Sequence, residues 1–201
     1  MTDPTDWPQY LPTKRTLVNR VLRWFDQASP HDIEQGATWY ADAHALASDL
    51  APALSNDGDG LKRAAEVIAA LSPRTIWSRN AAGAVLLVTK GEALPGLLGR
   101  NVGLARQIIE GERLASLTNG PKIQAFAKNI AGDTWTVTVD VHAAYAVGVD
   151  EKTLSRARCY DAVAEAYQAA ALARGVEPST MQATTWILAR RAKWSLNRQR
   201  G

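Results

Sequence analysis

The sequence predicts an all-α protein. Apolar residues recur at intervals of three and four through most of the chain, which is the spacing of one face of a helix. Proline, glycine and small polar residues interrupt these segments repeatedly, as they do between successive helices. Alanine is abundant, and its small side chain allows helices to approach one another closely.

The individual helices follow from this spacing and from the residues at their ends. Residues 16–27 are expected to form the first, and Ser29-Pro30 then opens a second over residues 31–54, because proline fits a first helical turn. Residues 55–60, with two glycines and three Asn or Asp residues, give the strongest linker signal. The remaining segments predict helices at 61–71, 76–90, 102–110, 122–131, 141–147, 156–174 and 179–197, a turn or two at 112–117 and a brief extended stretch at 135–139.

Composition excludes several classes of protein. The chain has 201 residues, of which 46% are apolar and 21% charged, so a folded core is expected rather than disorder. No apolar stretch is long enough for a membrane helix, and the first residues lack the pattern of a signal peptide. The single cysteine, Cys159, excludes an internal disulfide and a cysteine-ligated cluster, and the three scattered histidines do not suggest zinc. We therefore expect a cytoplasmic protein without a metal or another cofactor.

Charge is distributed unevenly along the chain. Residues 1–60 hold nine acids and four bases, whereas the rest of the chain holds eleven acids and nineteen bases. No acid follows Glu177, while five bases do. Such a basic segment suits a polyanionic partner such as nucleic acid. A solvated, charged tail is the alternative, and charge alone favours neither.

One segment, from Leu114 to Phe126, predicts a helical hairpin. Its turn is Thr118-Asn119-Gly120, where the glycine allows a positive φ, and Pro121 is placed to begin the second helix. The unpaired N–H groups at that helix start are able to hold a phosphate. Many helical hairpins have this form without any ligand.

Two further segments carry polar residues at expected helix ends. Asp140 follows the apolar run Thr136–Val139 and is expected to cap the next helix, a role that needs no catalytic function. Leu71-Ser72-Pro73-Arg74 forms a polar break between two apolar helices. On the last helix, Gln182 and Trp186 stand four residues apart, and core packing is favoured for them over a polar contact.

Together these segments resemble the helix-hairpin-helix DNA glycosylase superfamily, the endonuclease III-like group. Lys122 and Asp140 are eighteen residues apart, similar to the lysine and aspartate of that family. Val139-Asp140-Val141-His142 resembles its Val-Asp-Thr-His, and Leu71-Ser72-Pro73-Arg74 resembles its Leu-Ser-Ala-Gln. Ala105-Arg106-Gln107-Ile108-Ile109 is similar to the helix before its hairpin. The resemblance covers residues 61–150.

The resemblance implies a DNA glycosylase with AP lyase activity, acting on a damaged or modified base that is flipped out of the duplex. It implies that Lys122 attacks C1′ and that Asp140 stabilises the developing sugar cation, as bond cleavage through an oxocarbenium-like state requires. The implied DNA contacts are Arg74, which would fill the gap left by the base, with Thr118, Asn119, Gly120 and Lys128. Ser72, His142 and Tyr145 are the weaker candidates for a substrate pocket.

The chain also departs from the family. Only Gly120 matches the Gly-x-Gly of its hairpin, the stretch between Arg74 and Lys122 is shorter, and the cysteines of the iron–sulfur members are missing. A short, phage-type branch of the superfamily is thought to transfer amino acids onto hypermodified thymine. Two alternatives therefore remain open: a transferase that modifies a DNA base on the same scaffold, and a non-catalytic DNA-binding or inhibitor protein.

The expected architecture is a two-lobed, helix-hairpin-helix glycosylase-like fold. Residues 1–60 and 151–201 would form one helical lobe, and residues 61–150 a central lobe that carries the hairpin. The cleft between the lobes would hold the nucleic acid.

Duplex binding is expected to weaken steeply as salt rises, because bases that contact phosphates displace counterions. Arg74, Arg79, Lys122 and Lys128 of the central lobe are expected to contribute most, and the C-terminal arginines next. Fluorescence anisotropy titrations of a duplex over a range of salt concentrations measure this slope. An affinity independent of salt would remove nucleic acid from the list of partners.

Overall fold

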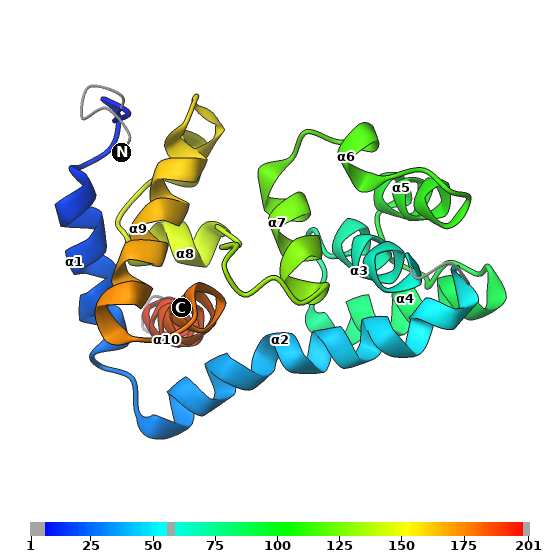
Figure 1. Ribbon diagram of the computed structural model, residues 1–201, viewed down its shortest axis with the longest axis horizontal. Coiled ribbons are helices and arrows are strands. Elements are labelled where there is room, and N and C mark those ends of the chain that lie inside the picture. The colour runs from blue at the N-terminus through cyan, green and yellow to red at the C-terminus, as the bar shows by residue number, and fades with distance from the viewer. Residues whose placement is uncertain (1–6, 56–58, 199–201) are drawn as a thin grey trace. The chain divides into compact units, whose positions relative to one another are not determined.

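The computed structural model describes residues 7–55 and 59–198, and every regular element in these residues is a helix (Figure 1). The predicted all-α class is therefore confirmed. The stretch expected to be extended, 135–139, is not part of a strand. Among the described residues, none of the helices combines the length and the apolar character that crossing a membrane requires.

The chain folds into two compact units. Unit 1 consists of Met1–Trp39 and Thr134–Gly201, and unit 2 of Tyr40–Asp133. These divisions come earlier in the chain than the predicted ones, which followed residues 60 and 150. The first lies inside helix α2 (Pro30–Leu50), which continues through it without a break. The second assigns Asp140 and the helix after it to unit 1, because that helix packs against the C-terminal one.

Unit 1 is built from helices near both ends of the chain. Its elements are α1 (Lys14–Phe25), the start of α2, α8 (Val141–Ala146), a 3-10 turn at Glu151–Ser155, α9 (Cys159–Arg174) and α10 (Pro178–Arg198). Helix α1 packs on α9 and α10, and Leu17 and Val21 of α1 are buried in the same core as Tyr167 and Met181. The Tyr167 hydroxyl donates to Ala143 O at 3.1 Å, which connects α9 to α8.

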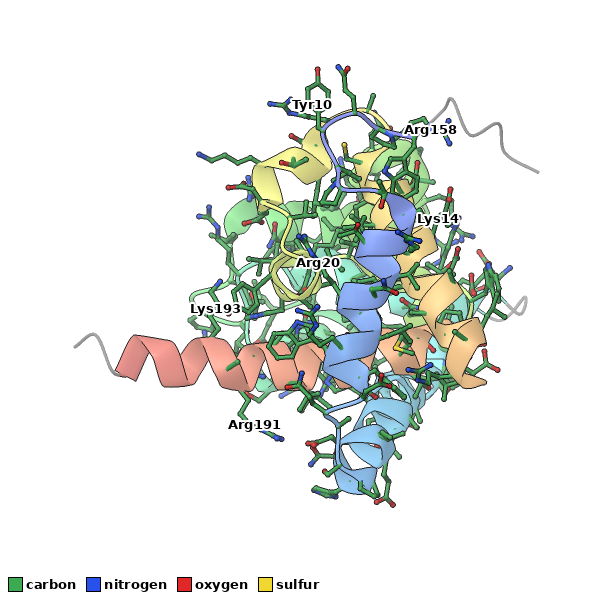
Figure 2. All side chains as sticks on the ribbon, turned by 90° about the vertical axis from the view of Figure 1, so that its left-hand side faces the viewer. Tyr10, Lys14, Arg20, Arg158, Arg191 and Lys193 are labelled. Carbon is green, nitrogen blue, oxygen red and sulfur yellow. The ribbon has the colours of Figure 1, made fainter. Side chains whose placement is uncertain are left out.

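The acidic start of the chain pairs with its basic end inside unit 1. Ser29 donates through N and Oγ to Asp32 Oδ2, and Arg191 donates to Asp32 Oδ1 at 2.7 Å. These bonds, led by that from Arg191, lower the pKa of Asp32 to about 2. Figure 2 shows Arg191 and Lys193 on opposite sides of α10. Ion pairs also join Asp26 to Arg174 and Lys14 to Glu165.

The uneven charge along the sequence is therefore not kept in the fold. Unit 1 contains thirteen bases and eleven acids, and unit 2 contains ten bases and nine acids. Each unit is close to neutral, because unit 1 combines the acidic N-terminal segment with the basic C-terminal one. Any attraction of a polyanion must then come from local groups of bases.

Unit 2 is organised around one buried helix. Its elements are the end of α2, a 3-10 turn at Ala51–Ala53, α3 (Gly60–Leu71), α4 (Trp77–Lys90), α5 (Gly99–Ile109), α6 (Leu114–Leu117) and α7 (Pro121–Ile130). Every residue of α3 from Ala64 to Leu71 is buried, and α3 packs against α4, α5 and α7. At the end of α7, Ile130 O lies 2.9 Å from His44 Nδ1 of α2.

Helices α2 and α10 approach each other closely at Gly36 in unit 1. A Cβ atom on Gly36 would lie 2.1 Å from Thr184 Oγ1 and 2.8 Å from Thr184 N. The second of these atoms belongs to the backbone and cannot rotate away, and Thr184 is fully buried. Glycine is therefore the residue that this crossing accommodates.

Gly36→Ala is expected to lower the free energy of unfolding by about 1–3 kcal/mol, because the added methyl group forces the two helices apart. Gly103→Ala is the matched control, since Gly103 lies inside α5 and a Cβ there meets no atom within 4 Å. It should leave stability unchanged or raise it by up to ~1 kcal/mol. Denaturant unfolding of both variants measures the difference, and equal midpoints would contradict the close crossing.

Candidate functional site

The predicted hairpin is present in unit 2 as α6, a short turn and α7. Gly120 N donates to Thr118 Oγ1 at 3.2 Å, and Gln124 Nε2 donates to Thr118 O at 2.6 Å. Gly120 has φ −68, so the turn does not use the positive φ that glycine allows. The threonine side chain closes the turn instead, and a Cβ at position 120 would make only ordinary contacts.

A buried acid fixes the hairpin to α3. Glu66 is 9% exposed, and its Oε1 accepts from Arg113 Nε at 3.2 Å and from Arg113 Nη2 at 2.9 Å. Its Oε2 accepts from Leu114 N, the first residue of α6, at 3.2 Å. The hydrogen bonds that Arg113 donates to Glu66 raise the pKa of Arg113. The sequence offered one signal for this contact, a lone acid within the apolar segment 61–71, and our sequence analysis missed it.

The break between α3 and α4 holds Arg74 in a left-handed conformation, with φ 61. Ser72 Oγ donates to Ala69 O at 2.8 Å, Thr75 N donates to Ser72 O at 3.1 Å, and Asn101 Nδ2 of α5 donates to Pro73 O at 3.3 Å. The Arg74 side chain is exposed. A residue other than glycine pays about 1 kcal/mol for this conformation, and such strain is often found at functional sites.

A groove of about 640 Å³ is lined by three segments of unit 2: the break after α3, helix α5 and the hairpin. It is lined by Pro73 of the break, by the start and middle of α5, and by Leu117, Thr118 and Ile123 of the hairpin. Its lining from α5 comprises Arg100, Asn101, Gly103, Leu104 and Gln107. Arg100 and Gln107 are exposed. They add a cation and an amide to a groove that polar and apolar residues line together.

Three of the predicted unit 2 residues line this groove or stand beside its lining residues in the sequence. Thr118 lines it, and the exposed side chains of Arg74 and Lys122 directly neighbour the lining residues Pro73 and Ile123 in sequence. Asn119 is exposed in the turn, and Lys128 is exposed in the last turn of α7. Arg79 differs from these bases, because its guanidinium donates to Pro95 O within unit 2.

Asp140 lies in unit 1 and caps α8, as expected. Its Oδ1 accepts from His142 N and Ala143 N, both at 2.9 Å, and its Oδ2 accepts from Trp186 Nε1 at 2.9 Å. The expectation that Trp186 serves core packing alone is therefore wrong, since its indole makes a polar contact. Lys122 belongs to unit 2, so the predicted catalytic pair is distributed over the two units.

The segment before Asp140 is held by a tyrosine of α9. Tyr160 Oη accepts from Val139 N at 3.0 Å and donates to Val137 O at 3.3 Å. Burial raises the pKa of Tyr160 well above its usual value. On the other side of Asp140, Arg20 of α1 donates to Val147 O at 2.6 Å, just beyond the end of α8; Figure 2 labels Arg20. Asp140 is thus placed by bonds to both flanking segments.

The three weaker pocket candidates do not share one environment. Ser72 belongs to unit 2, where its hydroxyl caps the end of α3. His142 meets the Trp186 ring edge-on, with ring centroids 5.7 Å apart, whereas Tyr145 faces Trp24 of α1 at 6.2 Å. Within residues 7–55 and 59–198, no group of three His, Cys, Asp or Glu residues is arranged to hold a metal ion.

Comparison with known proteins identifies the family of this chain. The chain belongs to the family described as "Family of unknown function (DUF7178)", whose model matches residues 9–193. Comparisons with curated proteins and with solved structures found no match.

Two substitutions at position 74 separate the strain of the turn from the role of the side chain. Both Arg74→Gly and Arg74→Ala remove the guanidinium, but only glycine adopts the left-handed conformation without cost. The glycine variant is expected to be more stable than the alanine variant by about 1 kcal/mol in denaturant unfolding.

Both variants should weaken duplex binding to the same extent if the guanidinium contacts DNA. An alanine variant as stable as the glycine variant would show that the turn stores no strain in solution.

Proposed function

For this member of a family of unknown function, we propose base excision from duplex DNA, in the manner of a DNA glycosylase with lyase activity. The observation that carries the proposal is the groove of unit 2. Three segments that resemble glycosylase motifs, the break at Pro73, helix α5 and the hairpin, contribute to its lining. Pro73 precedes the first lining residue of α5, Arg100, by 27 positions, so the fold brings the break to the other two segments.

The surroundings of the groove suit a DNA backbone. Arg100 lines it, and the exposed bases Arg74 and Lys122 follow or precede lining residues by one position. Helix α7 starts at Pro121, and the first N–H groups of a helix have no partner within the helix. Such groups, next to basic side chains, are typical ligands of a phosphate. The hairpin is also fixed to α3 through Glu66, which preorganises this surface.

In this proposal, Lys122 of unit 2 is the nucleophile. The neutral amine forms a bond to C1′ while the C1′–N bond breaks, and the bonding electrons leave with the base, which takes up a proton. The lysine nitrogen loses a proton, the C1′–O4′ bond breaks as O4′ takes up a proton, and the open sugar is a protonated Schiff base. Loss of a C2′ proton to water leaves electrons that form the C2′–C3′ double bond, and the 3′ phosphate departs with the C3′–O bond electrons, which cuts the strand.

Lys122→Gln is expected to abolish both strand cleavage and covalent trapping by borohydride, because the amide cannot form the Schiff base that borohydride reduces. DNA affinity should fall only modestly, since one exposed cation is lost. Lys62→Gln is the matched control: it removes an exposed lysine from α3 of the same unit and should retain trapping. The assay uses duplexes that carry a panel of damaged and hypermodified bases.

The outcomes of this assay separate the three functions. Trapping that persists in Lys122→Gln would move the nucleophile to another residue. A change in the mass of a base without strand cleavage would identify a transferase. Binding by the wild-type protein with no product from any substrate would leave a non-catalytic DNA-binding or inhibitor protein.

A further inference from the structure

Helix α5 presents one continuous stripe of residues to the groove of unit 2. The members of this α5 stripe, which follow one another at intervals of three, one and three residues, are Arg100, Gly103, Leu104 and Gln107. Such intervals place side chains on one face of a helix. At a rise of 1.5 Å per residue, the stripe runs for about 10 Å along the helix axis. The groove therefore has a cation near one end of the stripe and an amide near the other.

The walls of the groove are fixed by contacts within unit 2. Asn101 Nδ2 donates to Pro73 O at 3.3 Å, which joins the start of α5 to the break. Gln124 Nε2 donates to Thr118 O at 2.6 Å and holds the hairpin turn on α7. The hairpin is also fixed to α3 through Glu66. Because these walls are already in place, little conformational entropy is lost when a ligand enters.

The two polar ends of the α5 stripe are available to a ligand. Arg100 and Gln107 are exposed, and neither side chain forms a hydrogen bond or an ion pair with another residue of 7–55 or 59–198. A guanidinium carries a positive charge and only donates, which suits a phosphate. An amide offers both donors and an acceptor, the combination that pairs with the edge of a nucleobase.

Apolar surface and open space separate these two groups. Leu104 lies between them on the α5 stripe, and Leu117 and Ile123 of the hairpin add half-buried apolar side chains to the lining. Gly103 contributes no side chain, and a Cβ there would meet no atom within 4 Å. A flat ring is held between apolar side chains in this way when a base has left its stack. Cation, apolar wall and amide thus follow one another as phosphate, ring and base edge do in one nucleotide.

We propose that this groove is a subsite for one unpaired nucleotide, with Arg100 at its phosphate, Leu104 against its ring and Gln107 at the edge of its base. The assignment of DNA as the source of that nucleotide rests on the proposed function. A volume of about 640 Å³ lies within the range of small-molecule sites, so a base with its sugar fits. Gln107 is then the residue that selects the base.

Filling the groove at Gly103 tests the subsite. The wild-type protein is expected to bind a duplex with one unpaired nucleotide about tenfold more tightly than the same duplex fully paired, the order of effect that contacts to one base contribute. Gly103→Leu should abolish this preference and keep the affinity for the paired duplex, which also shows that the variant is folded. Fluorescence anisotropy titrations measure both affinities.

Gly99→Leu is the matched control for this variant. Gly99 is the first residue of α5, a Cβ there also meets no atom within 4 Å, and the groove lining does not include it. The same substitution on the same helix should therefore retain the preference for the unpaired nucleotide.

Gln107→Met tests which residue selects the base, because it keeps the length of the side chain and removes its donors and its acceptor. The wild-type affinities for duplexes with an unpaired dA, dC, dG or dT should differ by about tenfold between the best and the worst base. In Gln107→Met the four affinities should become equal, while the preference over the paired duplex remains.

The outcomes separate the subsite from the proposed chemistry. An unchanged preference in Gly103→Leu, or no preference in the wild-type protein, would overturn the subsite, whether or not the protein excises bases. Binding of free dAMP by a wild-type protein that shows no preference would assign the groove to a free nucleotide instead. A protein that shows the preference, loses it in Gly103→Leu and excises no base would contradict the proposed function and leave the subsite standing.

Discussion

The crossing of α10 over the start of α2 is the constraint on which unit 1 depends. Gly36 lets the two helices meet at Thr184, and the ion pair of Asp32 with Arg191 joins them again two turns along α10. Trp186 lies on the stretch of α10 between these two contacts, and its indole reaches Asp140 from there. A backbone contact that only glycine permits therefore sets the position of a hydrogen bond to the candidate catalytic carboxylate.

In unit 2, side-chain hydrogen bonds rather than a glycine contact hold the candidate site residues in place. Its hairpin turn contains no left-handed glycine, and the order of the turn comes from the Thr118 side chain and from the Glu66 carboxylate beneath α6. Burying an acid is costly unless it is paired and hydrogen-bonded, and Glu66 meets both conditions through Arg113 and Leu114 N. The strained residue of this unit, Arg74, lies where the break meets the start of α5. The hairpin that Glu66 supports and the strained Arg74 thus lie beside the same groove.

The sequence predicted the features that depend on neighbouring residues alone, namely the helices and the cap at Asp140. The helices follow from apolar spacing, and Asp140 was recognised as a cap because a carboxylate at that place satisfies nearby N–H groups. The two units have other boundaries than the expected lobes, and the first boundary lies within a continuous helix, where no linker marks it. The contact of Trp186 with Asp140 depends on how distant helices pack, so spacing along one helix suggested core packing instead. Glu66 was overlooked for the same reason, since its partners lie in a segment almost fifty residues away.

The distribution of charge could not be predicted from the sequence either, because it depends on which distant segments pair in the fold. Counted along the chain, the bases of the second part suggest a strongly attractive field, but Asp32 and Asp26 draw Arg191 and Arg174 into ion pairs within unit 1. A nearly neutral unit attracts a distant polyanion only weakly. The salt dependence of binding reflects instead how many phosphates the bases contact directly. In the proposed function, DNA affinity arises from a few exposed bases on segments that are held in place. Arg74, Arg100 and Lys122 around the groove of unit 2 meet that condition, because the break, α5 and the hairpin that carry them are each tied to the buried α3 or to one another.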